Sequence, residues 1–141
     1  MNTRYSLLNN RTITIAMVLL VLLVLFGHCA NSGQSEAIER RISSAEAKKI
    51  MDDSANVIIL DVRTEEEYRA KHIENAVLLP VGEIKERAHI VIPDKNALIL
   101  VHCLRGGRSK VATGTLISMG YTNVYDFGGI ETWGYGTVSV D

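Results

Sequence analysis

The hydrophobic positions from residue 42 onward gather in short apolar runs that are separated by polar stretches. The residues in these runs are consecutive rather than alternating, and many are β-branched. Such runs are typical of strands buried on both faces, because alternation is expected where one face meets water. We therefore predict strands over residues 57–60, 76–79, 97–102 and 124–127.

The polar stretches between these runs carry helix signals. Ser43 lies three residues before Glu46, and Thr64 lies three residues before Glu67. Both pairs fit the capping box that begins a helix. The alternation of strands and helices predicts an α/β fold with a parallel sheet that helices cover on both faces. Helices are predicted over residues 43–51, 64–71, 81–91 and 109–119.

The start of the chain has a different character. Arg4 and Arg11 precede an almost unbroken aliphatic run over residues 13–26. A basic start followed by such a run is typical of a secretory signal, and the run is short for a spanning helix, which needs about twenty residues. We interpret residues 1–33 as a signal or membrane anchor, 34–41 as a polar linker and 42–141 as the folded domain.

Three fates of this segment remain open. The residues before Cys29 resemble a bacterial lipoprotein signal, in which this cysteine would be lipidated and become N-terminal. The second is cleavage after Ser32 by an ordinary signal peptidase, and the third is an uncleaved anchor. All three place the folded domain outside the cytoplasm, in the periplasm or cell envelope, and we expect attachment to the membrane.

Charge and cysteine content exclude several classes of function. Residues 1–33 hold two arginines and no acidic residue, so the rest of the chain has thirteen Lys and Arg against sixteen Asp and Glu, a net charge of −3. A weakly acidic domain is a poor partner for nucleic acid phosphates. The two cysteines, Cys29 and Cys103, are too few for a disulfide framework or a structural zinc site.

The stretch 98–109 carries the most chemistry. An apolar run ends at Cys103, and Arg105, Gly106, Gly107 and Arg108 follow before a predicted helix. Nearby cations and a helix N-terminus lower the pKa of a thiol, which makes it a better nucleophile. Glycines allow successive N–H groups to turn inward as a nest for an anion. In parallel sheets, sites lie at the carboxyl ends of strands, where the sequence places this cysteine.

Several short motifs follow one another from about residue 42 to residue 133: Asp61-Val62-Arg63, Glu67-Tyr68, His72-Ile73 with Ala76 and Pro80, the loop 103–108, and Gly128-Gly129-Ile130 with Trp133. In this order and spacing they resemble the rhodanese domain family. The fold that the resemblance implies is α/β and rhodanese-like, with a parallel, mostly five-stranded sheet flanked by helices on both faces. The activity that it implies is sulfur transfer from thiosulfate or a similar donor to a thiophilic acceptor.

The resemblance also implies roles for individual residues. Cys103 would be the nucleophile that holds sulfur as a persulfide. We expect Arg108 to be partly buried against Asp61 or a backbone carbonyl, although a salt bridge at the helix start alone remains an alternative. Asp61 and Arg63 either support the loop or form a structural ion pair. The residues that would bind the substrate are Leu104, Arg105, Gly106, Gly107, Arg108 and Ser109.

The histidines have structural interpretations. His102 adjoins Cys103, but neighbouring side chains in a strand point to opposite faces, so we expect no Cys–His pair. His72 is interpreted as a structural, hydrogen-bonding histidine. The remaining histidines, His28 and His89, have no ligand spacing with other residues. We therefore expect no metal and no cofactor.

Departures from the family pattern keep other functions open. Leu104 stands where thiosulfate-using relatives often carry arginine, and Glu67 stands where some relatives carry a cation. These replacements favour, as the alternative, a persulfide-carrying or protein-binding module with little turnover. A phosphatase-like enzyme is a third function. Four residues separate Cys103 from Arg108, and rhodanese-fold phosphatases carry five, so the loop length favours sulfur.

Overall fold

The strands arise from the predicted apolar runs. The computed structural model describes residues 40–140, which contain β1 (Val57–Asp61), β2 (Val77–Leu78), β3 (Leu98–Cys103) and β4 (Val124–Gly129). The strand order is β2-β1-β3-β4, and every pairing is parallel. The predicted α/β fold with a parallel sheet is confirmed.

The sheet has four strands in the described residues, where the resemblance implied mostly five. A single parallel bridge joins Arg41 to Asp126 at the outer edge of β4. The N–H of Ile42 donates to the Asp126 carbonyl at 2.9 Å, and the N–H of Asp126 donates to the Arg40 carbonyl at 2.7 Å. One bridged residue is shorter than the usual strand of three residues or more, so this edge contact does not add a fifth strand.

The helices follow the capping signals. Both predicted capping boxes are present, at Ser43 with Glu46 and at Thr64 with Glu67. The predicted helix over residues 81–91 divides into a 3-10 turn and an α-helix. The helices are α2 (Ser44–Asp53), α3 (Glu65–Ala70), α4 (Ile84–Val91) and α5 (Gly107–Ser118), and the 3-10 turns are η1 (Val81–Glu83) and η2 (Ile130–Thr132).

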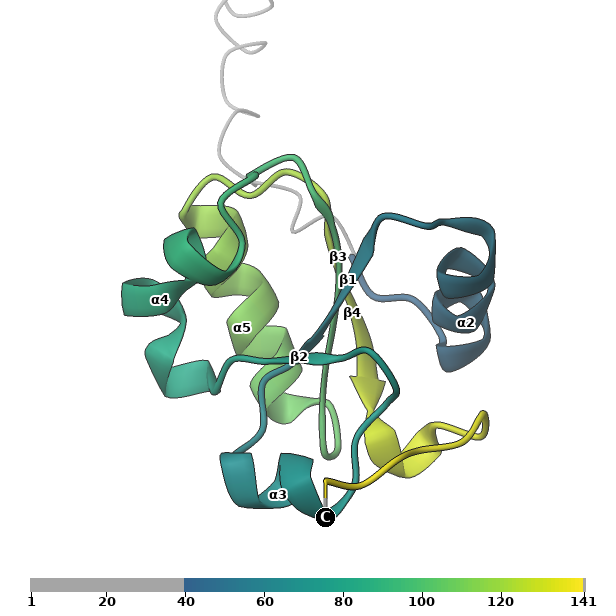
Figure 1. The fold of residues 1–141 in the computed structure, drawn as a ribbon. Helices are drawn as coiled ribbons and strands as arrows, with labels where there is room; N and C mark the ends of the chain where they lie inside the picture. Colours follow the sequence, from purple (N-terminus) through teal and green to yellow (C-terminus); the bar gives the residue numbers. More distant parts are fainter. Residues whose placement is uncertain (1–39, 141) are drawn as a thin grey trace, which may run out of the picture. The chain divides into compact units, whose positions relative to one another are not determined.

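Helices cover the sheet on both faces, as predicted (Figure 1). On one face, α4 and α5 pack through residues such as Ile84 and Leu116 against Val101 and Cys103. On the other face, α2 packs through Ala47 against Leu100 and Phe127. Successive residues of β3 therefore enter different cores, which explains why its run is apolar throughout.

A β-bulge interrupts the pairing of β3 with β4 just before the carboxyl ends. Val101 pairs with Asp126, whereas the next residue, His102, pairs with Gly128. Phe127 is thus the extra residue on β4. The bulge is held by a hydrogen bond from the N–H of Gly128 to Asp126 Oδ1 at 2.8 Å. Bulges redirect a strand and are common beside functional sites.

Across residues 40–140, none of the helices combines the length and the apolar character needed to cross a membrane. The predicted signal or anchor segment and Cys29 lie outside the described residues.

Candidate functional site

Cys103 is the last residue of β3, and its side chain lies on the face of the sheet that α5 covers. Its exposed fraction is 1 %. The helix after the loop begins at Gly107, two residues earlier than predicted. The residue before it, Gly106, has φ of +99° and carries no side chain that could mark a cap in the sequence. As a result, Arg108 and Ser109 both lie in the first turn of α5.

The loop directs hydrogen-bond donors toward the sulfur. The N–H of Gly106 donates to Cys103 Sγ at 3.1 Å. Burial raises the pKa of the Cys103 thiol, but hydrogen bonds from the backbone and hydroxyl of Ser109, and from the N–H groups of Gly106 and Arg105, outweigh it. The net pKa of Cys103 therefore lies below its ordinary value. These donors, with the positive end of α5, favour the thiolate.

Ser109 connects three parts of the site. Its hydroxyl lies 3.7 Å from Cys103 Sγ, 3.1 Å from the Gly106 carbonyl and 3.2 Å from the Gly128 carbonyl. The side chain is fully buried. Ser109 therefore holds the loop and the end of β4 in one position relative to the sulfur, in addition to its own contact with it.

The end of β4 forms a wall against the loop. Gly129 pairs with Cys103 across the two strands, and a Cβ atom placed on it would lie only 2.3 Å from the Leu104 carbonyl oxygen. Gly128 has φ of +92°, a conformation that favours glycine. Both glycines belong to the family motifs of the sequence, but they were not among the residues predicted to form the site.

Arg108 is partly buried, as predicted, but it hydrogen-bonds to Glu67 rather than to Asp61 or a backbone carbonyl, in agreement with the alternative of a salt bridge at the helix start. Its two terminal nitrogens each donate to a different oxygen of Glu67 on α3, both at 2.7 Å. The hydrogen bonds from Arg108 outweigh burial and hold the pKa of Glu67 at about 2, and Glu67 raises the pKa of Arg108 in turn. The partner was missed because Glu67 was interpreted only as a capping residue and a family departure.

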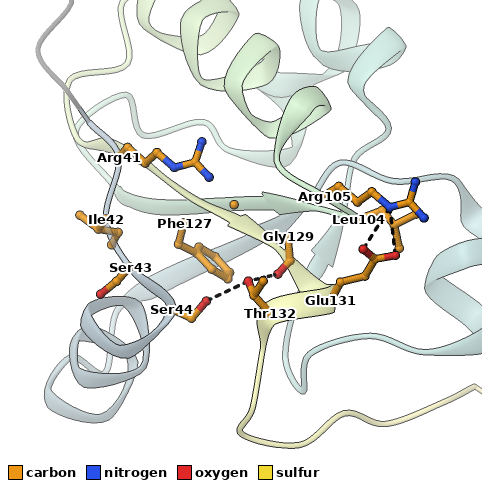
Figure 2. Close-up of a pocket in the computed structure, with 11 residues that line it drawn as sticks. Arg41, Ile42, Ser43, Ser44, Leu104, Arg105, Phe127, Gly129, Glu131 and Thr132 are labelled. Atoms are coloured by element: carbon orange, nitrogen blue, oxygen red, sulfur yellow. Dashed lines mark hydrogen bonds and ion pairs between the residues drawn. The ribbon is translucent and has the colours of Figure 1, made fainter.

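The side chain of Arg105 is paired with Glu131. Its Nε donates to both carboxylate oxygens of Glu131, at 3.2 and 3.0 Å (Figure 2). The side chain is 76 % exposed, so this pair is weak by the standard of surface ion pairs. Leu104, beside it, packs with its apolar side chain against the core that α2 covers.

A groove of about 390 Å³ lies beside the loop (Figure 2). Leu104, Arg105, Phe127 and Glu131 contribute to its lining, together with Arg41 from the edge of the sheet. Cβ atoms placed on Gly106 and Gly128 would lie 3.4 and 3.3 Å from the Arg41 guanidinium. Cys103 does not line this groove. Arg41 is therefore next to the loop but outside the sulfur cradle, by which we mean Cys103 Sγ and the groups of Arg105, Gly106 and Ser109 around it.

Asp61 and Arg63 form a buried ion pair. Arg63 Nε donates to Asp61 Oδ1 at 2.9 Å, and a terminal nitrogen donates to Asp61 Oδ2 and to the Lys71 carbonyl, both at 2.6 Å. Their hydrogen bonds connect the end of β1 to the end of α3 rather than to the loop. This arrangement agrees with a structural ion pair, which acts on the site through the position of α3.

The histidines occupy structural positions. His102 is fully buried and stacks toward Phe127 with ring centroids 5.2 Å apart, on the opposite face of the sheet from Cys103. Burial lowers the pKa of His102, which favours the neutral ring. His72 bonds through Nδ1 to the Tyr68 carbonyl at 2.9 Å and stacks on the Tyr68 ring. Within residues 40–140, no group of His, Cys, Asp or Glu is arranged to hold a metal ion.

The sequence matches known sulfurtransferases. The Rhodanese-like domain family matches residues 43–135. The thiosulfate sulfurtransferase PspE of Escherichia coli is 40% identical over 72 residues, which are 51% of this chain and 69% of the relative. The thiosulfate sulfurtransferase GlpE of Coxiella burnetii is 33% identical over 95 residues, which are 67% of this chain and 86% of the relative.

Solved structures show the same fold. A rhodanese with anions from E. coli is 36% identical with a TM-score of 0.56, and the match covers 59% of this chain and 98% of that one. A rhodanese-like domain protein from Staphylococcus aureus is 31% identical with a TM-score of 0.62, covering 72% of this chain and 98% of the other. The chain therefore belongs to the rhodanese-like domain family, as a rhodanese-type sulfurtransferase.

Proposed function

We propose that the chain moves sulfane sulfur from a small anionic donor to a thiophilic acceptor through a persulfide on Cys103. The observation that carries this proposal is the buried sulfur at the end of β3, with the N–H of Gly106 directed at it and the Ser109 hydroxyl 3.7 Å away. Such a cradle stabilises a thiolate before the reaction and a persulfide anion after it. Thiosulfate is the first donor to test, because two relatives are named for it.

The first half-reaction breaks the sulfur–sulfur bond of the donor. The Cys103 thiolate attacks the outer sulfur of thiosulfate, a disulfide-type bond forms to Cys103, and sulfite leaves with the bonding electron pair. In the second half-reaction, an acceptor thiolate or cyanide attacks the outer sulfur of the persulfide and releases the Cys103 thiolate. Backbone N–H groups near Gly106 balance the negative charge on sulfur in each state.

Mass spectrometry of the intact protein after incubation with thiosulfate tests this function. We expect a gain of one sulfur atom on Cys103, its loss when cyanide or a thiol is added, and no gain in Cys103→Ser. No adduct with thiosulfate, an organic thiosulfonate or polysulfide would refute the proposal.

A second candidate, a persulfide carrier with little turnover, is favoured by one observation: both loop arginines are already paired with carboxylates. A carrier would take up sulfur once and release it only to a specific protein thiol. Repeated turnover of thiocyanate formation with cyanide would exclude the carrier. A single stoichiometric uptake, with no transfer to cyanide, would support it.

We further propose that the domain works outside the cytoplasm, attached to the membrane. The support is the basic start and apolar run of residues 1–33, with Cys29 as the candidate lipidation site. Labelling of cells with a lipid precursor, for the native chain and Cys29→Ala, tests the attachment. Label that depends on Cys29 supports the lipoprotein fate. Recovery of the unlabelled protein from the cytosol would contradict the proposed location.

A further inference from the structure

Both cationic side chains of the loop are neutralised by carboxylates that lie outside it. Arg108 pairs with Glu67 on α3, and Arg105 pairs with Glu131 on η2. Each loop arginine therefore contributes a dipole at the site rather than a free positive charge. The Arg108 pair is the more buried of the two, with side chains 34 and 26 % exposed, so water screens it less.

The Arg108 pair occupies the end of the guanidinium, where the two terminal nitrogens could bind an oxyanion. A guanidinium binds a sulfonate or carboxylate most strongly through two parallel N–H groups. Both terminal nitrogens of Arg108 already donate to Glu67, one to each oxygen. A donor with a sulfonate group would have to displace Glu67 before it gained this bidentate contact.

Glu67 is itself fixed in place. Its Oε2 accepts hydrogen bonds from the N–H and the hydroxyl of Thr64, at 3.0 and 3.1 Å, in addition to the one from Arg108. These bonds form the capping box that begins α3. The capping box therefore holds this carboxylate in place beside Arg108.

Two other arginines lie near the site, but neither takes the place of the paired Arg105 and Arg108 as a cation in contact with the sulfur. Arg63 is buried and paired with Asp61, and Arg41 lies in the groove that Cys103 does not line. Leu104, the residue after Cys103, carries no charge, and it packs against the core that α2 covers. The two loop arginines, paired with Glu131 and Glu67, therefore add no net charge to that of the Cys103 thiolate.

We propose that Glu67 sets the charge of the sulfur donor, so that the enzyme favours monoanionic donors, such as organic thiosulfonates, over dianionic thiosulfate. This inference rests on the proposed function. With benzenethiosulfonate, the Cys103 thiolate takes the outer sulfur and benzenesulfinate leaves with the bonding electrons. The reaction has the same balance as that with thiosulfate, with one negative charge fewer on the donor and on the leaving group.

The test compares kcat/KM for thiosulfate and benzenethiosulfonate in the native chain and in Glu67→Gln. Glutamine keeps the size of the side chain and can complete a capping box, but it leaves the Arg108 charge uncompensated. One added positive charge several ångströms from the donor favours binding by about fivefold per donor charge. The ratio of thiosulfate to benzenethiosulfonate activity should therefore rise about fivefold in Glu67→Gln.

Glu65→Gln is the matched control, because it makes the same charge change on the exposed side of the same helix. We expect it to leave the ratio unchanged, since exposed charges are screened. If the ratio of kcat/KM values for the two donors is unchanged in Glu67→Gln, or shifts equally in Glu65→Gln, Glu67 does not set the charge of the donor.

Salt dependence in the native chain gives an independent measurement should Glu67→Gln fail to fold. Salt weakens repulsion between the negatively charged cradle and its donor, so kcat/KM for thiosulfate should rise with ionic strength, and more steeply than for benzenethiosulfonate. A fall with salt would refute the inference and indicate a free cation. These outcomes differ from failure of the proposed function, in which neither donor leaves sulfur on Cys103.

Discussion

Gly129→Ala is a sharp test of how β4 supports the catalytic loop. Gly129 has φ of −117° and ψ of 144°, which alanine adopts without strain. The difficulty is only the space: the new Cβ would lie 2.3 Å from the Leu104 carbonyl oxygen and 2.7 Å from Arg105 Cα, where 3.0 Å is the closest approach that real Cβ atoms make. The backbone of the loop must therefore move by about 0.7 Å.

Two magnitudes follow from this displacement. Forcing one extra methyl group into a packed site costs about 1–3 kcal/mol, and about 2 kcal/mol lowers the Tm of a domain of this size by roughly 10 °C. Misplacement of reacting groups by about 1 Å costs up to about 100-fold in rate. We expect Gly129→Ala to remain folded at room temperature and to lose about 10- to 100-fold in the rate of sulfur uptake by Cys103.

Gly114→Ala is the control for the same chemical change. Gly114 lies in the interior of α5 with nothing within 4 Å of its added Cβ, so alanine should stabilise the helix by about 1 kcal/mol. Thermal unfolding and single-turnover persulfide formation are measured for both variants. We expect the Tm to fall in Gly129→Ala and to rise in Gly114→Ala. Native Tm and native uptake in Gly129→Ala would refute the close contact.

Two further predictions concern protons at the site. Ser109→Ala removes a hydroxyl that lowers the pKa of Cys103, so the pH profile of sulfur uptake should move to higher pH; an unchanged midpoint would contradict this role. The Arg108 pair holds the pKa of Glu67 at about 2, below its ordinary 4.5. The pair therefore stabilises the fold above about pH 4.5, and this contribution is lost as the pH falls toward 2. Chemical denaturation across that range should give a shallower loss of stability in Glu67→Gln than in the native chain.

The sequence predicts those features of the fold that depend on residues close together in the chain. Consecutive apolar residues indicate strands buried on both faces, and both capping boxes lie where the spacing of three residues places them. Cys103 lies at the carboxyl end of its strand as predicted, because the apolar run ends there, although β3 includes it. Residues close in the chain determine these features, so their physical causes can be recognised in the sequence alone.

The sequence does not predict contacts that join distant segments. Glu67 and Arg108 are 41 residues apart. The capping-box pattern predicts the bonds of Glu67 to Thr64, but it does not predict that an arginine also donates to this carboxylate. Gly129 must be glycine because another segment, the Leu104 backbone, approaches it. The number of strands was misjudged for a similar reason, since the pairing of Arg41 with Asp126 extends over only one residue.

The bulge at Phe127 has a consequence for protein engineering. The extra residue sets the register in which Gly128 and Gly129 reach His102 and Cys103, so half of the cradle wall depends on a strand that begins twenty-one residues after Cys103. A graft of residues 103–108 alone into a foreign parallel sheet would carry the thiol and its N–H groups but not their support. The smallest transplantable unit of this chemistry is β3, the loop, α5 and β4 together, with the bulge retained.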